Sequence, residues 1–185
     1  GRVDKDGYLW LTGRRKELII RGGHNIDPAV IEEVLYQIPD VKSAAALGRP
    51  DAYAGEVPVA YVELKEDSTL TPEAVMDYAR ENIGERAAVP KSVEIIDQIP
   101  VTAVGKIFKP ALRWKASQAV FEKELAAVSD VTEWIEVEAG EDKKHGTRVD
   151  IRAKAASGAD AGTVRERIND ILSPYTLYTE ITIAG

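Results

Sequence analysis

The sequence predicts an α+β protein: a small sheet with flanking helices, preceded by a β-hairpin and followed by an additional small α+β unit. Three helix-start signals are each followed by apolar residues at helical spacing. Short apolar runs that are typical of strands lie between them. The pattern of apolar and polar residues changes after Ser129–Asp130. We therefore divide the 185 residues into 1–128 and 129–185, which is within the size range of two small domains.

The N-terminal stretch predicts a hairpin and a loop. Asp4–Gly7 is a turn signal, with glycine supplying a positive φ angle. Tyr8–Thr12 and Glu17–Arg21 have strand composition, and their proximity predicts that they pair as a hairpin. The glycine-rich Gly22–Asn25 is expected to be a flexible loop.

The next segment predicts a helix and two strands. Asp27 is a favourable N-cap and is followed by proline at the first helical position, which predicts an amphipathic helix over Pro28–Ile38. Val41–Leu47 and Val57–Leu64 are apolar, strand-like runs. The polar residues 49–56 between them are expected to form a loop.

The remainder of the first part predicts two more helices. Thr71 caps a helix whose apolar face ends at Ile83. Ser92–Ile96 is a short strand, and Gln98–Lys106 is a loop. A third helix begins at Lys109–Pro110 and extends to about Val128.

The second part predicts the order strand, strand, helix, strand. Apolar residues alternate with polar ones around Ile135–Ala139, Val149–Ala153 and Ile181–Ile183, and Gly162–Leu172 has helical spacing. We find no internal repeat in the residue pattern, and the role of this extension is open.

Composition excludes several classes of function. The chain has no cysteine, which excludes disulfides and thiolate metal sites, and its two histidines are far apart, so we expect no metal site. A net charge of −7 disfavours nucleic-acid binding. No apolar run is long enough for a transmembrane segment, and we expect a cytoplasmic protein. The chain begins with Gly1 and its only methionine is Met76, so we expect a piece of a longer protein.

Two segments contain residues suited to chemistry, namely Gly13–Glu32 and Pro100–Ile107. The second segment places Lys106 on a glycine-bearing loop, from which a lysine can reach a phosphate or a carboxylate. It is not a phosphate-binding P-loop, which would need glycine at position 100 and serine or threonine at 107. Taken singly, the second segment favours an ordinary solvated lysine after a turn, and the first is equally compatible with a charged hairpin and a loose glycine turn.

Taken together and in this order, the two segments resemble the hinge motif and the C-terminal lysine motif of adenylate-forming enzymes. The resemblance covers about Gly1–Ser117, and the residues in 22–28 and 50–56 look most like those of fatty-acyl or aryl-CoA ligases. Two positions depart from the usual pattern: Val30 stands where a glutamate is common, and Lys16 where many relatives have aspartate. The residues after Val131 match nothing in the family.

The resemblance implies an ATP-dependent acid–CoA ligase. A carboxylic acid and Mg²⁺-ATP would give an acyl-adenylate and pyrophosphate, and CoA would then displace AMP. Lys106 would be the catalytic adenylation lysine, Lys16 the hinge, and Arg14 a nucleotide-binding residue. Gly22, Gly23 and His24 would approach CoA after the domain rotates about the hinge.

The resemblance also implies a missing N-terminal domain that supplies most of the active site. The isolated chain is therefore expected to be catalytically inert, with no ATP, Mg²⁺ or CoA bound. Two alternatives remain open. The chain could belong to an adenylation domain that loads a carrier protein, or it could be a non-catalytic interaction module.

Overall fold

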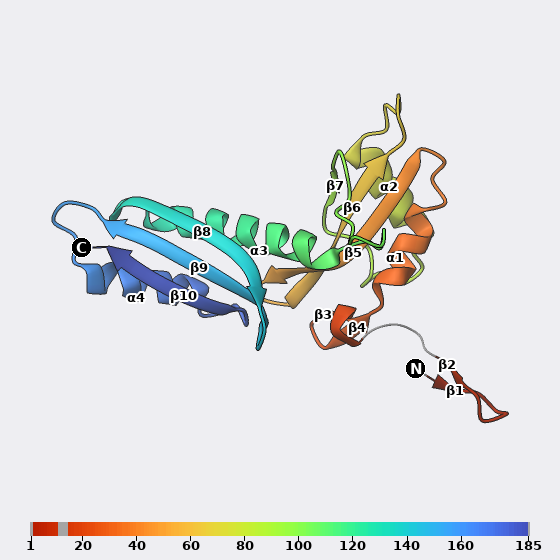
Figure 1. Ribbon diagram of the computed structural model, residues 1–185, viewed down its shortest axis with the longest axis horizontal. Coiled ribbons are helices and arrows are strands. Elements are labelled where there is room, and N and C mark those ends of the chain that lie inside the picture. The colour runs from red at the N-terminus through yellow and green to blue at the C-terminus, as the bar shows by residue number, and fades with distance from the viewer. Residues whose placement is uncertain (1, 11–14, 185) are drawn as a thin grey trace. The chain divides into compact units, whose positions relative to one another are not determined.

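The computed structural model describes residues 2–10 and 15–184, which fall into two compact units (Figure 1). The first unit comprises Gly1–Gly48 and Glu56–Phe108. The second comprises Arg49–Gly55 and Lys109–Gly185. No helix in the described ranges is both long enough and apolar enough to cross a bilayer.

The N-terminal part of the first unit contains two short hairpins. Strand β1 (Arg2–Val3) pairs antiparallel with β2 (Leu9–Trp10), and β3 (Ile19–Arg21) pairs antiparallel with β4 (His24–Ile26). The predicted pairing of the Tyr8–Thr12 strand with the Glu17–Arg21 strand is therefore wrong. Each strand instead pairs with its other neighbour, because the turns at Gly7 and at Gly22–Gly23 both close a hairpin.

The remainder of the first unit has a helix, a strand hairpin, a second helix and a parallel strand. These elements are α1 (Pro28–Leu35), β5 (Val41–Asp51), β6 (Gly55–Leu64), α2 (Pro72–Asn82) and β7 (Val93–Ile95). The sheet order is β4-β3-β6-β5, and β7 pairs parallel with β6. The predicted elements are confirmed, but the expected loop over residues 49–56 shrinks to a tight turn because the strands extend into it.

The core of the first unit lies between the two helices and one face of the sheet. Both helices contribute an apolar stripe, and the strands contribute small residues, which let the helices approach the sheet closely. The buried set includes Ile31, Leu35, Ile38, Ala44, Ala46, Ala60, Val62, Val75, Ala79 and Ile83. The caps expected at Asp27 and Thr71 are both present, with their side chains accepting from Ala29 N and Ala74 N.

The second unit has α3 (Lys109–Leu125), a 3₁₀ turn η2 (Ala126–Val128), β8 (Thr132–Asp142), β9 (Gly146–Ala155), α4 (Ala161–Leu172) and β10 (Tyr178–Ala184). β8 is antiparallel and β10 parallel to the central β9. The predicted order of strand, strand, helix, strand is confirmed. Helix α3 belongs to this unit. The boundary that we drew from the sequence, after Val128, had placed this helix in the first part.

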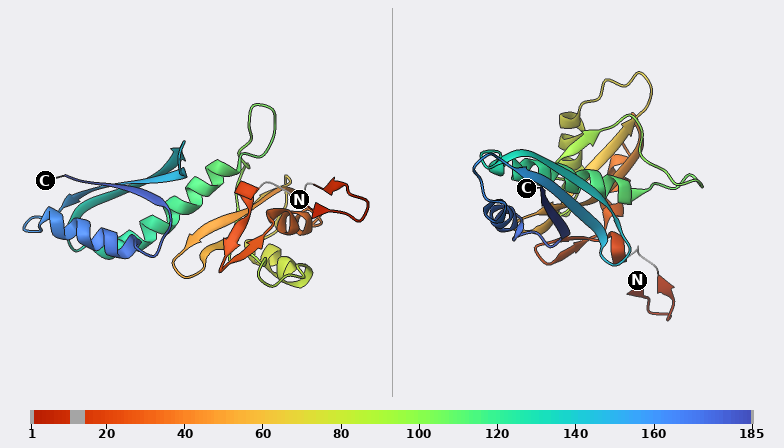
Figure 2. Two further views of the ribbon diagram at one scale, coloured as in Figure 1. Left: turned by 90° about the horizontal axis from the view of Figure 1, so that it is seen from below. Right: turned by 60° about the vertical axis from the view of Figure 1, so that its left-hand side comes forward.

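The two helices of the second unit cover one face of its sheet (Figure 2). Phe121, Leu125 and Val128 of α3 and η2 pack with Val164, Ile168 and Leu172 of α4. The strand residues beneath them alternate along β8 and β9, including Val137, Val149, Ile151 and Ala153. Because alternate residues share one face of a strand, the other face of this sheet is left to polar side chains.

The two units repeat a single architecture. Each has a helix, an antiparallel hairpin, a second helix and a strand parallel to the second strand of the hairpin. The first hairpin strand has 11 residues in both copies, and the second has 10. The turns also match: Asp51 accepts from two amides before Gly55, and Asp142 does the same before Gly146. Both glycines have positive φ.

The registers of the two copies agree residue by residue. Val93 and Ile95 pair with Ala60 and Val62 in the first copy, and Ile181 and Ile183 pair with Ile151 and Ala153 in the second. The spacing Ile31, Leu35, Ile38 recurs as Phe121, Leu125, Val128, and the spacing Val75, Ala79, Ile83 recurs as Val164, Ile168, Leu172. The chain therefore contains an internal structural repeat, contrary to the prediction of none.

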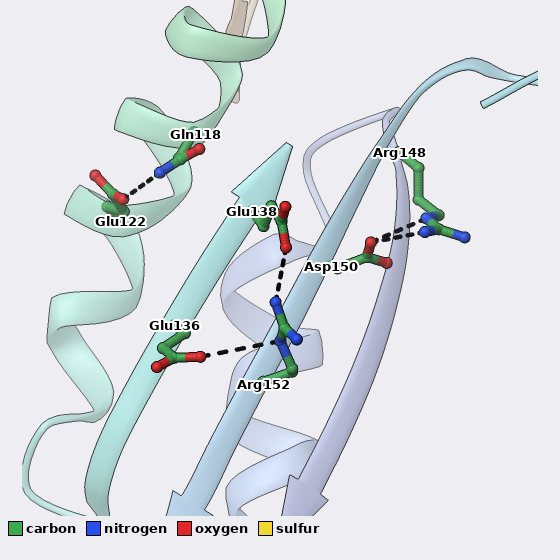
Figure 3. A network of polar contacts seen from close by, with 7 residues as sticks. All are labelled: Gln118, Glu122, Glu136, Glu138, Arg148, Asp150 and Arg152. Atoms are coloured by element: carbon green, nitrogen blue, oxygen red, sulfur yellow. Dashed lines mark hydrogen bonds and ion pairs between the residues drawn. The ribbon is translucent and has the colours of Figure 1, made fainter. Parts of the chain in front are cut away.

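The two copies differ on the sheet face that points away from this core. The first copy has buried apolar residues there, including Ala45, Leu47, Val59 and Tyr61. The corresponding positions of the second copy are Glu136, Glu138, Asp150 and Arg152, which form part of a charged network (Figure 3). This change of polarity hides the repeat in the sequence, since the first copy has apolar residues on both faces and the second alternates.

Candidate functional site

The lysine loop is the segment from Pro100 to Phe108, between β7 and α3. It closes on itself through bonds from Phe108 N to Pro100 O and from Thr102 N to Lys106 O, both 2.7 Å long. Val101 and Ile107 form an isolated antiparallel bridge. The loop is therefore a small ordered hairpin, and this geometry presents Lys106 near its tip.

Glycine and threonine shape this tip. Gly105 has φ of 78°, a left-handed conformation that a side chain disfavours, and its amide bonds Thr102 O at 2.8 Å. The hydroxyl of Thr102 accepts from the Lys106 amide at 3.2 Å. The Lys106 residue is exposed, and Val104 beside it is 79% exposed. Lys106 and the apolar Val104 are therefore both exposed on one hydrogen-bonded turn.

The base of the lysine loop is held by Glu63 of β6. One carboxylate oxygen accepts from Ile99 N at 2.8 Å, and the other lies 2.6 Å from the Lys42 ammonium. The side chain of Glu63 is only 8% exposed. The Lys42 ammonium and then the Ile99 amide hold the pKa of Glu63 below its ordinary value, so the carboxylate is charged at neutral pH.

Gly22 and Gly23 form the two-residue turn between β3 and β4. Their φ angles are 55° and 85°, and the flanking Arg21 and His24 are directly paired. Two successive positive φ angles are typical of a type I′ hairpin turn, which explains the glycine pair. The segment expected to be a flexible loop is therefore a tight turn, with His24 exposed on its far side.

This hairpin is attached to the remainder of the first unit by strand pairing and by hydrogen bonds, and its Ile19 and Ile26 are buried in the core. β3 pairs with β6 in the sheet, and Ile20 N donates to a carboxylate oxygen of Glu56 at 2.9 Å. The Arg21 guanidinium donates to Ala87 O at 2.7 Å. The glycine turn is thus the free end of an anchored hairpin.

The two other predicted site residues lie before this hairpin. Lys16 is exposed within a 3₁₀ turn, η1 (Arg15–Glu17), where a strand had been expected to start nearby. Arg14, the predicted nucleotide-binding residue, lies outside the described residues.

The structure separates the lysine loop from the glycine turn. Their anchors, Glu63 and Glu56, lie seven positions apart on β6, which corresponds to roughly 23 Å of strand. The two segments are thus attached to opposite ends of one strand.

Two residues of α1, Val30 and Glu32, lie at or close to a position where the sequence departs from the family pattern. Val30, which replaces a glutamate, is 40% exposed on α1. Glu32 in the same helix accepts from Ala46 N at 2.7 Å and so joins α1 to β5. The anchoring roles of Glu32, Glu56 and Glu63 could not be identified in the sequence, because each carboxylate binds an amide far along the chain.

The described residues contain no group of three or more His, Asp or Glu side chains placed to hold a metal ion.

Part of the chain is similar to a known family of domains. Residues 30–106 match the model of the AMP-binding enzyme C-terminal domain, which ends at Lys106. The chain is 55% identical over 113 residues to a marinolic acid–CoA ligase of Pseudoalteromonas sp. (strain SANK 73390), an alignment that covers 61% of this chain and 17% of that ligase. It is 42% identical over 121 residues to an indoleacetate–CoA ligase of Aromatoleum aromaticum, covering 65% of this chain and 24% of the relative.

Solved structures agree with the sequence comparison. A fatty acyl CoA synthetase of Mycobacterium tuberculosis superposes with a TM-score of 0.55 at 34% identity, covering 64% of this chain and 23% of that structure. ATP-bound MatB from Rhodopseudomonas palustris gives a TM-score of 0.56 at 32% identity, covering 61% and 22%. The chain thus spans about a fifth of the length of these relatives. Residues 30–106 thus match the AMP-binding enzyme C-terminal domain, and the relatives that align with this part of the chain are named as CoA ligases or CoA synthetases.

Proposed function

We propose that this chain is the C-terminal part of an ATP-dependent acid–CoA ligase in which Lys106 serves adenylate formation. The observation that carries the proposal is the ordered hairpin that presents the Lys106 ammonium and Val104 to the outside. An exposed apolar residue beside a cation suits a loop that enters a pocket formed by another domain. The position of Lys106 at the end of the matched family segment supports the same role.

The chemistry needs a cation at this place. When the substrate carboxylate attacks the α-phosphorus of ATP, negative charge is shared among the attacking carboxylate, the phosphoryl oxygens and the departing pyrophosphate. An ammonium placed before the reaction stabilises this charge more in the transition state than in the ground state. Lys106 supplies such a charge from a rigid turn, so little ordering is needed when the loop docks.

The glycine turn suits the second half-reaction, in which the CoA thiol attacks the acyl carbon and AMP leaves. We propose that Gly22, Gly23 and His24 then lie along the CoA path. The anchors of the two segments are roughly 23 Å apart along β6. The two segments would therefore enter the same active site one after the other. Rotation of the domain between half-reactions satisfies this requirement.

We propose Lys16 as the hinge for this rotation. Short 3₁₀ turns often serve as connectors, and η1 connects the N-terminal residues to the anchored β3. Arg14 is proposed to bind the nucleotide near the hinge.

The test is Lys106→Ala in the complete ligase. Adenylate formation, measured as acid-dependent pyrophosphate exchange, should fall roughly 10²- to 10³-fold, because a transition-state charge contact is removed. Thioester formation from a supplied acyl-adenylate should persist. Lys91→Ala removes another exposed lysine of the same unit and serves as the control. Unchanged pyrophosphate exchange in Lys106→Ala would refute the assignment.

The acceptor of the acyl group is a separate question. An amide bond synthetase from Marinactinospora thermotolerans superposes with a TM-score of 0.50 at 37% identity, so similar domains occur in enzymes with other acceptors. The alternative proposal is acyl transfer to a carrier protein. Supplying CoA or a carrier protein to the preformed acyl-adenylate distinguishes the two.

We propose that the repeat unit in 129–185, together with the C-terminal half of α3, lies outside this catalytic machinery. Its outer sheet face is charged where the first copy is apolar, and β10 pairs with β9 from Arg148 to Lys154, on the edge that β3 shares with β7 in the first copy. Residues 148–154 of β9 therefore have no free edge that a hairpin like β3–β4 could join.

A further inference from the structure

Strand β6 contains two carboxylates that each accept from a backbone amide in another segment. Glu63 accepts from Ile99, which directly precedes Pro100 at the start of the lysine loop. Glu56 accepts from Ile20, two positions before the Gly22–Gly23 turn. Each of the two segments used in the proposed half-reactions is thus tied to β6 by one acidic side chain.

The bond from Ile99 to Glu63 is well placed to fix a backbone position. Ile99 is 1% exposed, so its amide would have no water to replace a lost acceptor. Glu63 is itself held by Lys42 through its other oxygen. A charged acceptor strengthens the bond to the amide, and burial at both ends restricts its movement.

The second copy of the fold shows what the sheet itself requires at these positions. Lys154 occupies the place of Glu63, and Glu133 occupies the place of Lys42. The two form an ion pair at 2.8 Å, so the cross-strand pair persists with its charges exchanged. Sheet pairing therefore accepts either order of the charges. Of these two arrangements, only the one with the carboxylate on the second strand can accept from an amide, because an ammonium has no acceptor.

Glu56 gives a parallel comparison. Its counterpart in the second copy is Thr147, which follows the positive-φ Gly146 as Glu56 follows Gly55. The second copy has no counterpart of β3, since β10 pairs with β9 from Arg148 to Lys154. The first copy has both a carboxylate at this position, Glu56, and the β3–β4 hairpin whose Ile20 amide it accepts from.

We propose that Glu63 and Glu56 are positioning residues for the two half-reactions: Glu63 fixes the lysine loop for adenylation, and Glu56 fixes the glycine-turn hairpin for thioester formation. The inference rests on the proposed function of those two segments. It adds that one strand positions both, through separate side chains that act independently.

The experiment compares matched substitutions in the complete ligase. Glu63→Met removes the acceptor at similar side-chain length and should lower pyrophosphate exchange roughly 10²-fold, the cost of a misplaced catalytic group. Thioester formation from supplied acyl-adenylate should be retained. Glu63→Gln keeps an oxygen acceptor for Ile99 and should retain most of the exchange rate. Glu56→Met should show the converse pattern, with thioester formation lowered and pyrophosphate exchange retained.

A charge exchange separates anchoring from folding. Lys42→Glu combined with Glu63→Lys reproduces the arrangement of the second copy, so the ion pair remains while the acceptor is lost. This variant should behave like Glu63→Met in both half-reactions. Amide hydrogen exchange provides a readout independent of activity. The Ile99 amide should lose protection in Glu63→Met but keep it in Glu63→Gln, with β5 and β6 unchanged.

The outcomes are distinguishable. If Lys106→Ala lowers pyrophosphate exchange and Glu63→Met does not, the anchoring inference is overturned and the proposed function stands. If Glu63→Met and Glu56→Met lower both half-reactions alike, the two carboxylates only maintain the fold, which also overturns it. If Lys106→Ala has no effect, the proposed function fails. The protection of Ile99 then still decides whether Glu63 holds the loop.

Discussion

Phe121→Ala tests whether the repeated unit has a core of its own. Phe121 is fully buried in α3, and its ring packs edge-on against Tyr175, with centroids 5.1 Å apart and planes at 87°. Truncating a buried phenylalanine to alanine costs about 3–5 kcal/mol, because apolar contact is lost and the cavity closes only in part. For a unit of this size each kcal/mol lowers Tm by about 4–8 °C, so a loss of at least about 12 °C is expected.

The assays are thermal denaturation, which gives Tm, and amide hydrogen exchange, both on the intact chain. Protection should fall in β8, β9 and α4, while the amides of β5 and β6 keep theirs. Ile31→Ala is the matched control, since Ile31 occupies the equivalent helix position in the first unit and is also fully buried. It should show the reverse distribution, with a loss of about 2–5 kcal/mol. Equal loss of protection in both units for either variant would refute the reasoning that each has a separate core.

Three further predictions concern local features. Gly146→Ala should cost about 1–2 kcal/mol in urea denaturation, because φ is 83° there, whereas Gly140→Ala at an open strand position should cost less. The Glu63 carboxylate has a lowered pKa, so its contribution to stability is present above the unfolded value of about 4.3 and is lost as pH falls through the folded value. The stability gap between the wild type and Glu63→Gln should thus narrow below about pH 4, and a constant gap would contradict this. Thr71→Ala and Asp160→Ala each remove a helix N-cap and should cost about 0.5–2 kcal/mol, measured by loss of exchange protection in α2 and α4 respectively.

Local signals predicted most of the elements correctly. Asp27 and Thr71 mark helix starts that the structure confirms, because a cap bonds an amide only two or three residues away. The alternation around Ile135–Ala139 and Val149–Ala153 likewise identified the strands of the second unit. Strand pairing was predicted less well than the strands themselves. Glu17–Arg21 was paired with the preceding strand, although the two glycines that follow it close a hairpin with β4.

The amino-acid sequence alone determined the helices and strands, the resemblance to adenylate-forming enzymes and the place of Lys106 on a glycine-bearing loop. These depend on residues close together in the chain, where spacing and backbone preference act directly. Only the tertiary structure revealed the repeated architecture, since the two copies share topology and register while their outer faces differ in polarity. It alone also revealed the carboxylates of β6 that hold Ile20 and Ile99, because such bonds exist only after the chain has brought distant segments together.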